Sequence, residues 1–119
     1  MFKKIFLLTA TVLLLSNCKS NNSMYNWGNY EKSVHNYNKS PMEKEKFAKK
    51  LQKIIKKGEK TNQVPPGVYA EYGYIMLELK NHDKAINYFN KEKKLWPESS
   101  KLMNIMIKRA NLQNKNNKK

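Results

Sequence analysis

The fold class follows from residues 66–99, which read PGVYAEYGYIMLELKNHDKAINYFNKEKKLWPES. Apolar residues recur there at helical spacing twice, first over 68–79 and again over 85–95. Asn81-His82-Asp83 lies between the two runs as a short polar turn, and the charge of Asp83 favours the start of a helix. Pro97 cannot continue the second helix. The stretch therefore predicts two antiparallel helices joined by a tight turn.

The same stretch resembles a tetratricopeptide repeat, because it is 34 residues long and carries small residues where that motif has them. Counted from Pro66, the matching residues are Gly73 at position 8, Ala85 at 20, Phe89 at 24 and Pro97 at 32. The small residues would let the two helices approach closely, and Phe89 would fill the seam. Glu92 occupies position 27, where Ala is usual, so packing there must differ. An ordinary helical bundle is the alternative.

The segments on either side also have helical patterns. Residues 42–58 place four apolar side chains on one face, with Ser40-Pro41 as the start signal and Gly58 as the C-cap; the four are Phe47, Leu51, Ile54 and Ile55. Residues 28–37 resemble a second repeat helix, in which Ser33 and Tyr37 match Ala85 and Phe89 at an offset of 52 residues, so the first half-repeat has diverged.

A last helix is expected from Glu98 to about Leu112, burying Leu102, Ile105 and Met106. The tail, residues 113–119, has no apolar side chain and is expected to be disordered and basic. The predicted fold is all-α: a small helical-hairpin, tetratricopeptide-like bundle of five helices over residues 27–112.

The N-terminus has the pattern of an export signal. Lys3 and Lys4 precede an uncharged apolar run over 5–15, which is short for a membrane span. Leu15-Ser16-Asn17-Cys18 resembles the lipobox of bacterial lipoproteins, although Asn17 stands where a small residue is usual. We expect residues 1–17 to be removed, Cys18 to be acylated and residues 18–26 to form a tether. An uncleaved anchor and a chance match are the alternatives.

Charge is the most extreme property of the composition. The chain has 24 basic and 9 acidic residues, a net charge of +15, and Arg109 is its single Arg. The high Lys content is accompanied by 16 Asn, and an AT-rich genome favours both residues through its codons. Surfaces that bind phosphate, in contrast, usually contain Arg. The basicity is therefore either compositional or a preference for anionic envelope surfaces, and nucleic acid is not expected. The residues that would bind such a surface are Lys49, Lys53, Lys56 and Lys60, on what is otherwise a solvated face.

Three blocks of sequence carry a family resemblance. They are Tyr25-Asn26-Trp27-Gly28-Asn29-Tyr30, the segment 65–74, and Asn90-Lys91-Glu92-Lys93 with Trp96-Pro97-Glu98-Ser99. These blocks resemble a family of small bacterial lipoproteins known as domain of unknown function 4810, and Glu92 fits that family's pattern. Members have no established activity. Their genes tend to lie beside two other lipoprotein genes, one related to the curli-secretion pore lipoprotein, which implies an outer-membrane assembly.

Catalytic patterns are scarce. His35 and His82 lie in different segments without a carboxylate or Cys at ligand spacing, and no phosphate-binding loop is present. We therefore expect no enzyme activity, no cofactor and no metal.

The residues expected to contact a protein partner are Tyr74, at repeat position 9 on the inner helix face, with Glu71, Leu77 and Glu78. The alternative for Tyr74 is packing or plain surface exposure. Trp27 is either a helix-entry core residue or an interface anchor.

The sequence as a whole predicts a lipid-anchored scaffold of the bacterial envelope, on the outer membrane and facing the periplasm. Its expected partners are the membrane, through Cys18, and envelope proteins, among them a curli-secretion-like pore lipoprotein and another lipoprotein. The alternative is a binder of anionic envelope surfaces or polymers.

Overall fold

A computed structural model describes residues 24–39 and 43–118, with side chains for 24–34 and 43–118. Five α-helices follow one another, and no strand occurs in these two ranges. They are α2 (Tyr30–Lys39), α3 (Lys44–Thr61), α4 (Val68–Glu78), α5 (His82–Leu95) and α6 (Ser100–Asn117), with a short 3₁₀ turn η2 (Pro97–Ser99) before α6. The predicted all-α bundle is confirmed. The signal peptide, Cys18, and the Ser40-Pro41 start signal lie outside the described residues.

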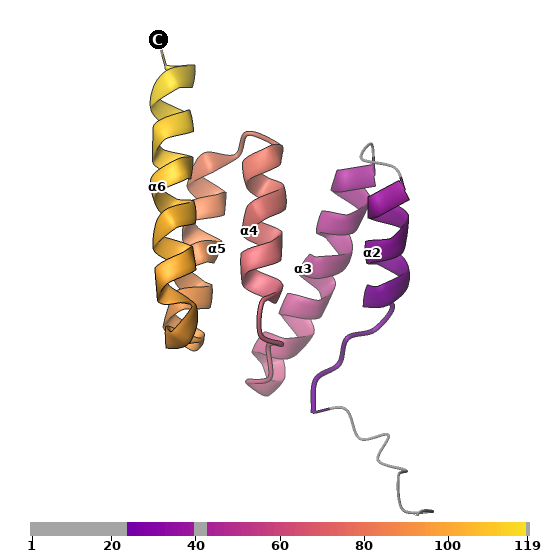
Figure 1. Cartoon of the computed structure of the whole chain (residues 1–119). Helices are drawn as coiled ribbons and strands as arrows, with labels where there is room; N and C mark the ends of the chain where they lie inside the picture. Colours follow the sequence, from indigo (N-terminus) through magenta and orange to yellow (C-terminus); the bar gives the residue numbers. More distant parts are fainter. Residues whose placement is uncertain (1–23, 40–42, 119) are drawn as a thin grey trace, which may run out of the picture.

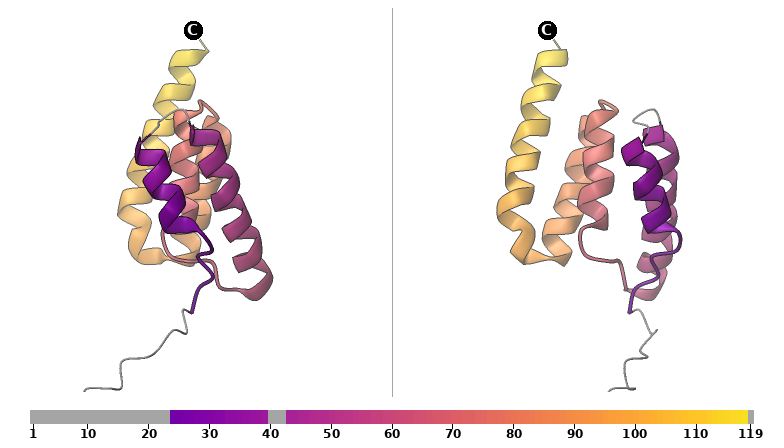
Figure 2. Two further views of the ribbon diagram at one scale, coloured as in Figure 1. Left: turned by 90° about the vertical axis from the view of Figure 1, so that its right-hand side faces the viewer. Right: turned by 45° about the vertical axis from the view of Figure 1, so that its right-hand side comes forward.

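The helices form a row in which each packs against the next and runs in the opposite direction (Figure 1). The right-hand view of Figure 2 also places α2 and α6 at opposite ends of this row, and the left-hand view looks along the row from the α2 end. Within the part of the chain described, no helix is both long enough and apolar enough to cross a membrane.

The seam between α4 and α5 forms as predicted. Ala85 and Phe89 are completely buried. A Cβ at Gly73 would lie 2.8 Å from Cε1 of Phe89, so only glycine allows the ring to lie this close to α4. These contacts explain why small residues and one aromatic ring occur at those positions, because the ring occupies the space that larger side chains would need.

Helix α3 buries its predicted apolar face: Phe47, Leu51, Ile54 and Ile55 are all at most 7% exposed. The prediction that Gly58 ends this helix is wrong. The helix continues to Thr61, and the left-handed residue that closes it is Asn62, whose N–H donates to the carbonyl of Gly58. Gly58 is needed for a close approach instead, because a Cβ there would lie 2.7 Å from Cα of Val64.

Helix α6 differs from the prediction in two ways. Leu102 and Ile105 are 58% and 57% exposed, whereas Met103 and Ala110 are buried and Met106 only half-buried. The helix has apolar residues on two sides, and the pattern alone does not show which side meets α5. The predicted disorder from Gln113 is also wrong, because the helix continues to Asn117. The Asn114 side chain donates a hydrogen bond to Asp83 Oδ1 at 3.3 Å, which holds this extension against the start of α5.

The unusual Glu92 closes the N-terminus of α4. The N-cap of α4 is Gly67, which has a positive φ of 85° and no side chain to accept a hydrogen bond. Oε1 of Glu92 accepts from the Gly67 N–H at 2.7 Å, and Oε2 accepts from the Ala70 N–H at 3.4 Å. Burial raises the pKa of the Glu92 carboxyl, while these backbone donors oppose the rise. A carboxylate on α5 thus supplies the cap that α4 lacks.

Candidate functional site

The residues expected to face a partner lie on the second half of α4. Leu77 and Glu78 lie three and four residues after Tyr74, which places all three side chains on one side of the helix. They line a hollow of about 410 Å³. Its other walls come from α6 and the α4–α5 turn; these residues are Lys80, His82, Arg109, Gln113, Asn116 and Asn117. We call this hollow the α4–α6 groove.

Burial and charge give the groove its character. Leu77 is 5% exposed and belongs to its floor, whereas the Tyr74 ring is 40% exposed. Glu78 Oε2 lies 3.4 Å from Lys44 Nζ, so its charge is already paired from α3. Arg109 and Lys80 bring two positive charges to the groove against the one negative charge of Glu78. Such a surface can stack against a flat or apolar group through Tyr74 and bind a carboxylate through Arg109.

Glu71 lies on α4 but faces a different neighbour. Its Oε2 accepts a hydrogen bond from Tyr30 Oη at 2.5 Å, which ties α4 to the start of α2. Burial raises the pKa of Glu71, and burial together with the hydrogen bond to this carboxyl raises the pKa of the Tyr30 hydroxyl. Glu71 is thus used in helix packing and does not line the α4–α6 groove.

Trp27 belongs to the same packing cluster as Tyr30. The two ring centroids are 5.1 Å apart, and a Tyr25 ring lies edge-on to Trp27 at 6.5 Å. Trp27 is half-buried against the core. This placement agrees with the helix-entry alternative, and it separates Trp27 from Tyr74.

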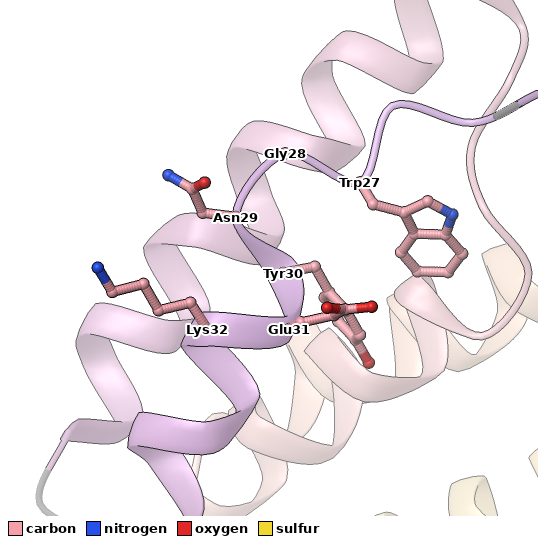
Figure 3. A pocket seen from close by; sticks show the side chains of 6 residues that line it. All are labelled: Trp27, Gly28, Asn29, Tyr30, Glu31 and Lys32. Carbon is pink, nitrogen blue, oxygen red and sulfur yellow. The ribbon is translucent and has the colours of Figure 1, made fainter. Parts of the chain in front are cut away.

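A second hollow, of about 610 Å³, surrounds the start of α2 over residues 27–32. Figure 3 shows that the side chains there do not converge: Trp27 and Tyr30 lie on one side of the chain, while Asn29 and Lys32 extend on the other. A ligand there would not be enclosed by groups acting together, so this hollow is a weaker candidate than the α4–α6 groove.

The lysines of α3 face a third hollow, of about 420 Å³, between α3 and the segment before α2. Lys53 and Lys56 line it as part of the predicted set, whereas Lys49 and Lys60 are exposed elsewhere on the helix. Sequence reasoning missed Lys50 and Lys57, because α3 carries lysines on so many positions that spacing does not single out a face. The other lining residues are Asn26, Gly28, Asn29 and Ile54. We call this the α3 lysine hollow.

The histidines do not assemble with other ligand-type side chains. His82 begins α5 and is buried, and the side chain of His35 lies outside the described part of the chain. Over residues 24–39 and 43–118, no group of three or more His, Cys, Asp or Glu is placed to hold a metal ion.

The fold and its groove define a small all-α bundle protein with an open hollow between its helices. Residues 24–106 match the model of a family described as Domain of unknown function (DUF4810), and the chain belongs to this family. The match covers more than two thirds of the chain, which confirms the resemblance seen in its sequence blocks. No curated protein and no solved structure matches the chain.

Proposed function

We propose that this protein is a lipid-anchored scaffold of the bacterial envelope that binds a protein partner in the α4–α6 groove and catalyses no reaction. The observation that carries the proposal is that Tyr74, which is 40% exposed, lines one hollow together with the buried Leu77 and with Arg109. Aromatic and Arg side chains at the centre of an interface supply most of its binding energy. Here both kinds line one hollow, together with the buried apolar side chain of Leu77.

The anchor follows from the lipobox-like Leu15-Ser16-Asn17-Cys18. Each buried methylene of an acyl chain contributes ~0.8 kcal/mol, so two or more chains on Cys18 hold a protein stably on a membrane. The helical row would then stand on the periplasmic side of the outer membrane as a short tetratricopeptide-like unit. A curli-secretion-like pore lipoprotein and a further lipoprotein are the partners that the family resemblance favours.

The test is capture of partners by tagged protein from detergent-solubilised envelopes. Tyr74→Ala should lose the captured partner while its circular dichroism and thermal unfolding stay unchanged, because an exposed ring contributes little to the core. Leu95→Ala is the matched control, since Leu95 is 46% exposed but does not line the groove. Equal capture by both variants would exclude the groove as the binding surface.

A second candidate function, binding of anionic envelope surfaces, is favoured by the α3 lysine hollow. Asn26 and Gly28 line this hollow and follow Cys18 closely in the chain. Asn26 lies eight residues after Cys18, a separation that spans at most about 29 Å even when the chain is fully extended. An acylated Cys18 would therefore keep the four lysines near the lipid head groups, whose negative potential attracts each of them.

Two double lysine variants of α3 distinguish specific binding in the hollow from a general effect of positive charge. Lys50→Gln with Lys57→Gln removes two charges that line the hollow, and Lys49→Gln with Lys60→Gln removes two that do not. Both pairs are tested in the mature chain with Cys18→Ser, on vesicles containing phosphatidylglycerol. Greater release of the first double variant from the vesicles would support specific binding in the hollow. Equal release of both double variants would mean that the lysines act only through the overall positive charge of the surface.

A further inference from the structure

Helix α6 carries an apolar stripe on the side that faces away from α5. Leu102, Ile105 and Leu112 are 58%, 57% and 54% exposed, and their spacings of three and seven residues place them on one face. The opposite face is held in the bundle by the buried Met103 and Ala110. We call the stripe of Leu102, Ile105 and Leu112 the α6 outer face.

A row of positive charge runs beside this stripe. Lys101, Lys108 and Lys115 repeat every seven residues and are exposed. Within residues 24–39 and 43–118, none of the three forms an ion pair closer than 4.0 Å. In coiled-coil terms Leu102 and Arg109 occupy a positions, Ile105 and Leu112 occupy d positions, and the three lysines all occupy g. The g row sets the choice of partner, because it faces charged positions of the opposing helix.

The place of α6 in the fold leaves this face open. α6 is the last helix of the row, and α2, which follows the N-terminal segment, lies at the other end (Figures 1 and 2). No other described helix packs on the outer face, since the principal neighbours of α6 are α5 and η2. The stripe is thus an amphipathic surface at the end of the molecule farthest from α2.

We propose that the α6 outer face docks an amphipathic helix of a partner protein that carries apolar residues at its own a and d positions and Glu or Asp against the lysine row. The charge pattern decides between occupants. In an antiparallel pair of two copies of this chain, the lysine rows would face each other, and each copy has a net charge of +15. An anionic bilayer fits less well, because Arg109 interrupts the stripe that would have to enter the apolar layer.

This surface adjoins the α4–α6 groove at Arg109, which lines the groove and also occupies an a position of the stripe. It does not require the lipid anchor or the Tyr74 side of the groove, so it goes beyond the scaffold role proposed above. It gives the protein a second docking site of different chemistry: the groove presents Tyr74, the outer face presents an apolar stripe flanked by lysines, and Arg109 lies at the border of the two. A protein with both could hold two partners together.

The experiment measures binding of two synthetic helices to the full chain in a mild nonionic detergent. Both peptides have roughly four heptads with Leu at a and d; one has Glu at e and g, the other Lys. Wild-type protein should bind the Glu peptide at least about tenfold more tightly than the Lys peptide. Ile105→Ser with Leu112→Ser should weaken that binding at least about tenfold, because it removes two central apolar contacts.

Matched variants locate the effect. Lys101→Glu, Lys108→Glu and Lys115→Glu together should reverse the preference, so that the Lys peptide binds more tightly. Lys49→Glu, Lys53→Glu and Lys60→Glu change the charge equally on α3 and should keep the wild-type preference. Leu79→Ser with Leu95→Ser removes two exposed leucines outside the stripe and should leave affinity unchanged. Tyr74→Ala should also bind the Glu peptide normally, which keeps failure of the groove distinct from failure of this site.

Several outcomes would overturn the proposal. Equal affinity of the wild-type protein for both peptides would show that the lysine row does not select a partner. An equal loss of the preference for the Glu peptide in the α3 charge variant would show that only the net charge of the protein matters. A dimer in sedimentation that Ile105→Ser abolishes would assign the face to a second copy. Displacement of the Glu peptide by phosphatidylglycerol vesicles, and not by phosphatidylcholine vesicles, would assign it to a membrane.

Discussion

Replacing Glu92 with Ala should destabilise the fold more than its place on a largely polar helix suggests. Glu92 is 3% exposed, and its two oxygens accept the N–H groups of Gly67 and Ala70 at 2.7 and 3.4 Å. Hydrogen bonds to a charged acceptor contribute about 1.5–3 kcal/mol each, and a buried donor left without a partner costs about 1–3 kcal/mol.

The net effect is smaller than the sum of these terms. The second bond is long, and burial of the carboxylate itself opposes folding, as the raised pKa of Glu92 indicates. We expect Glu92→Ala to lower the free energy of unfolding by about 2–3 kcal/mol, which for a domain of this size lowers Tm by about 10–20 °C. Glu92→Gln keeps one acceptor oxygen and should lose about 1 kcal/mol.

The assay is urea and thermal unfolding followed by circular dichroism at 222 nm, near neutral pH. Glu98→Ala is the matched control, because it removes a carboxylate of the same type from an exposed position on η2. Its stability should stay within about 0.5 kcal/mol of wild type. A Glu92→Ala variant that unfolds together with the wild-type protein would refute the view that α5 caps α4.

Three further predictions concern the same packing. Burial raises the folded pKa of Glu92 above its ordinary value of 4.5, so the unfolded chain gives up this proton at a lower pH than the folded chain does. The extra stability of the wild type over Glu92→Gln should therefore be largest below pH 4.5 and shrink as the pH rises through the folded pKa. Urea unfolding of both proteins from pH 4 to 7 measures this difference. Tyr30→Phe should cost about 1–2 kcal/mol because Glu71 loses its donor, and amide exchange should increase first in α2; uniform exchange would contradict this order. Gly58→Ala should cost about 1–3 kcal/mol in thermal unfolding, because its Cβ would meet the Val64 backbone at 2.7 Å, and a neutral result would mean that the 62–67 loop moves freely.

Much of the fold could be predicted because two elements have a single apolar face. The α3 face and the α4–α5 seam were predicted correctly, because Leu51 and Phe89 lie on helices with one buried side and the small residue Gly73 marks where α4 meets Phe89. Helix α6 was misread because apolar side chains lie on two of its faces. Only the contact with α5 determines that Met103 is buried and Ile105 is not.

The candidate site was predicted in part. Tyr74, Leu77 and Glu78 meet in one groove because their spacing is local to α4. Glu71 satisfies the same spacing but is held by Tyr30, 41 residues earlier, and no local pattern reveals so distant a partner. The α6 wall of the groove could not be foreseen either, since it depends on the orientation of a helix whose pattern was ambiguous.

The most direct test of the scaffold role is capture from detergent-solubilised envelopes by tagged protein with Cys18 intact, washed at about 0.15 M and then about 1 M salt, where the Debye length falls from about 8 Å to about 3 Å. We expect one or two envelope proteins to remain in stoichiometric amounts after the second wash, to be lost with Tyr74→Ala and to be kept with Leu95→Ala. Loss of all captured material at high salt, leaving only salt-labile anionic components, would contradict the scaffold role and favour the α3 lysine hollow.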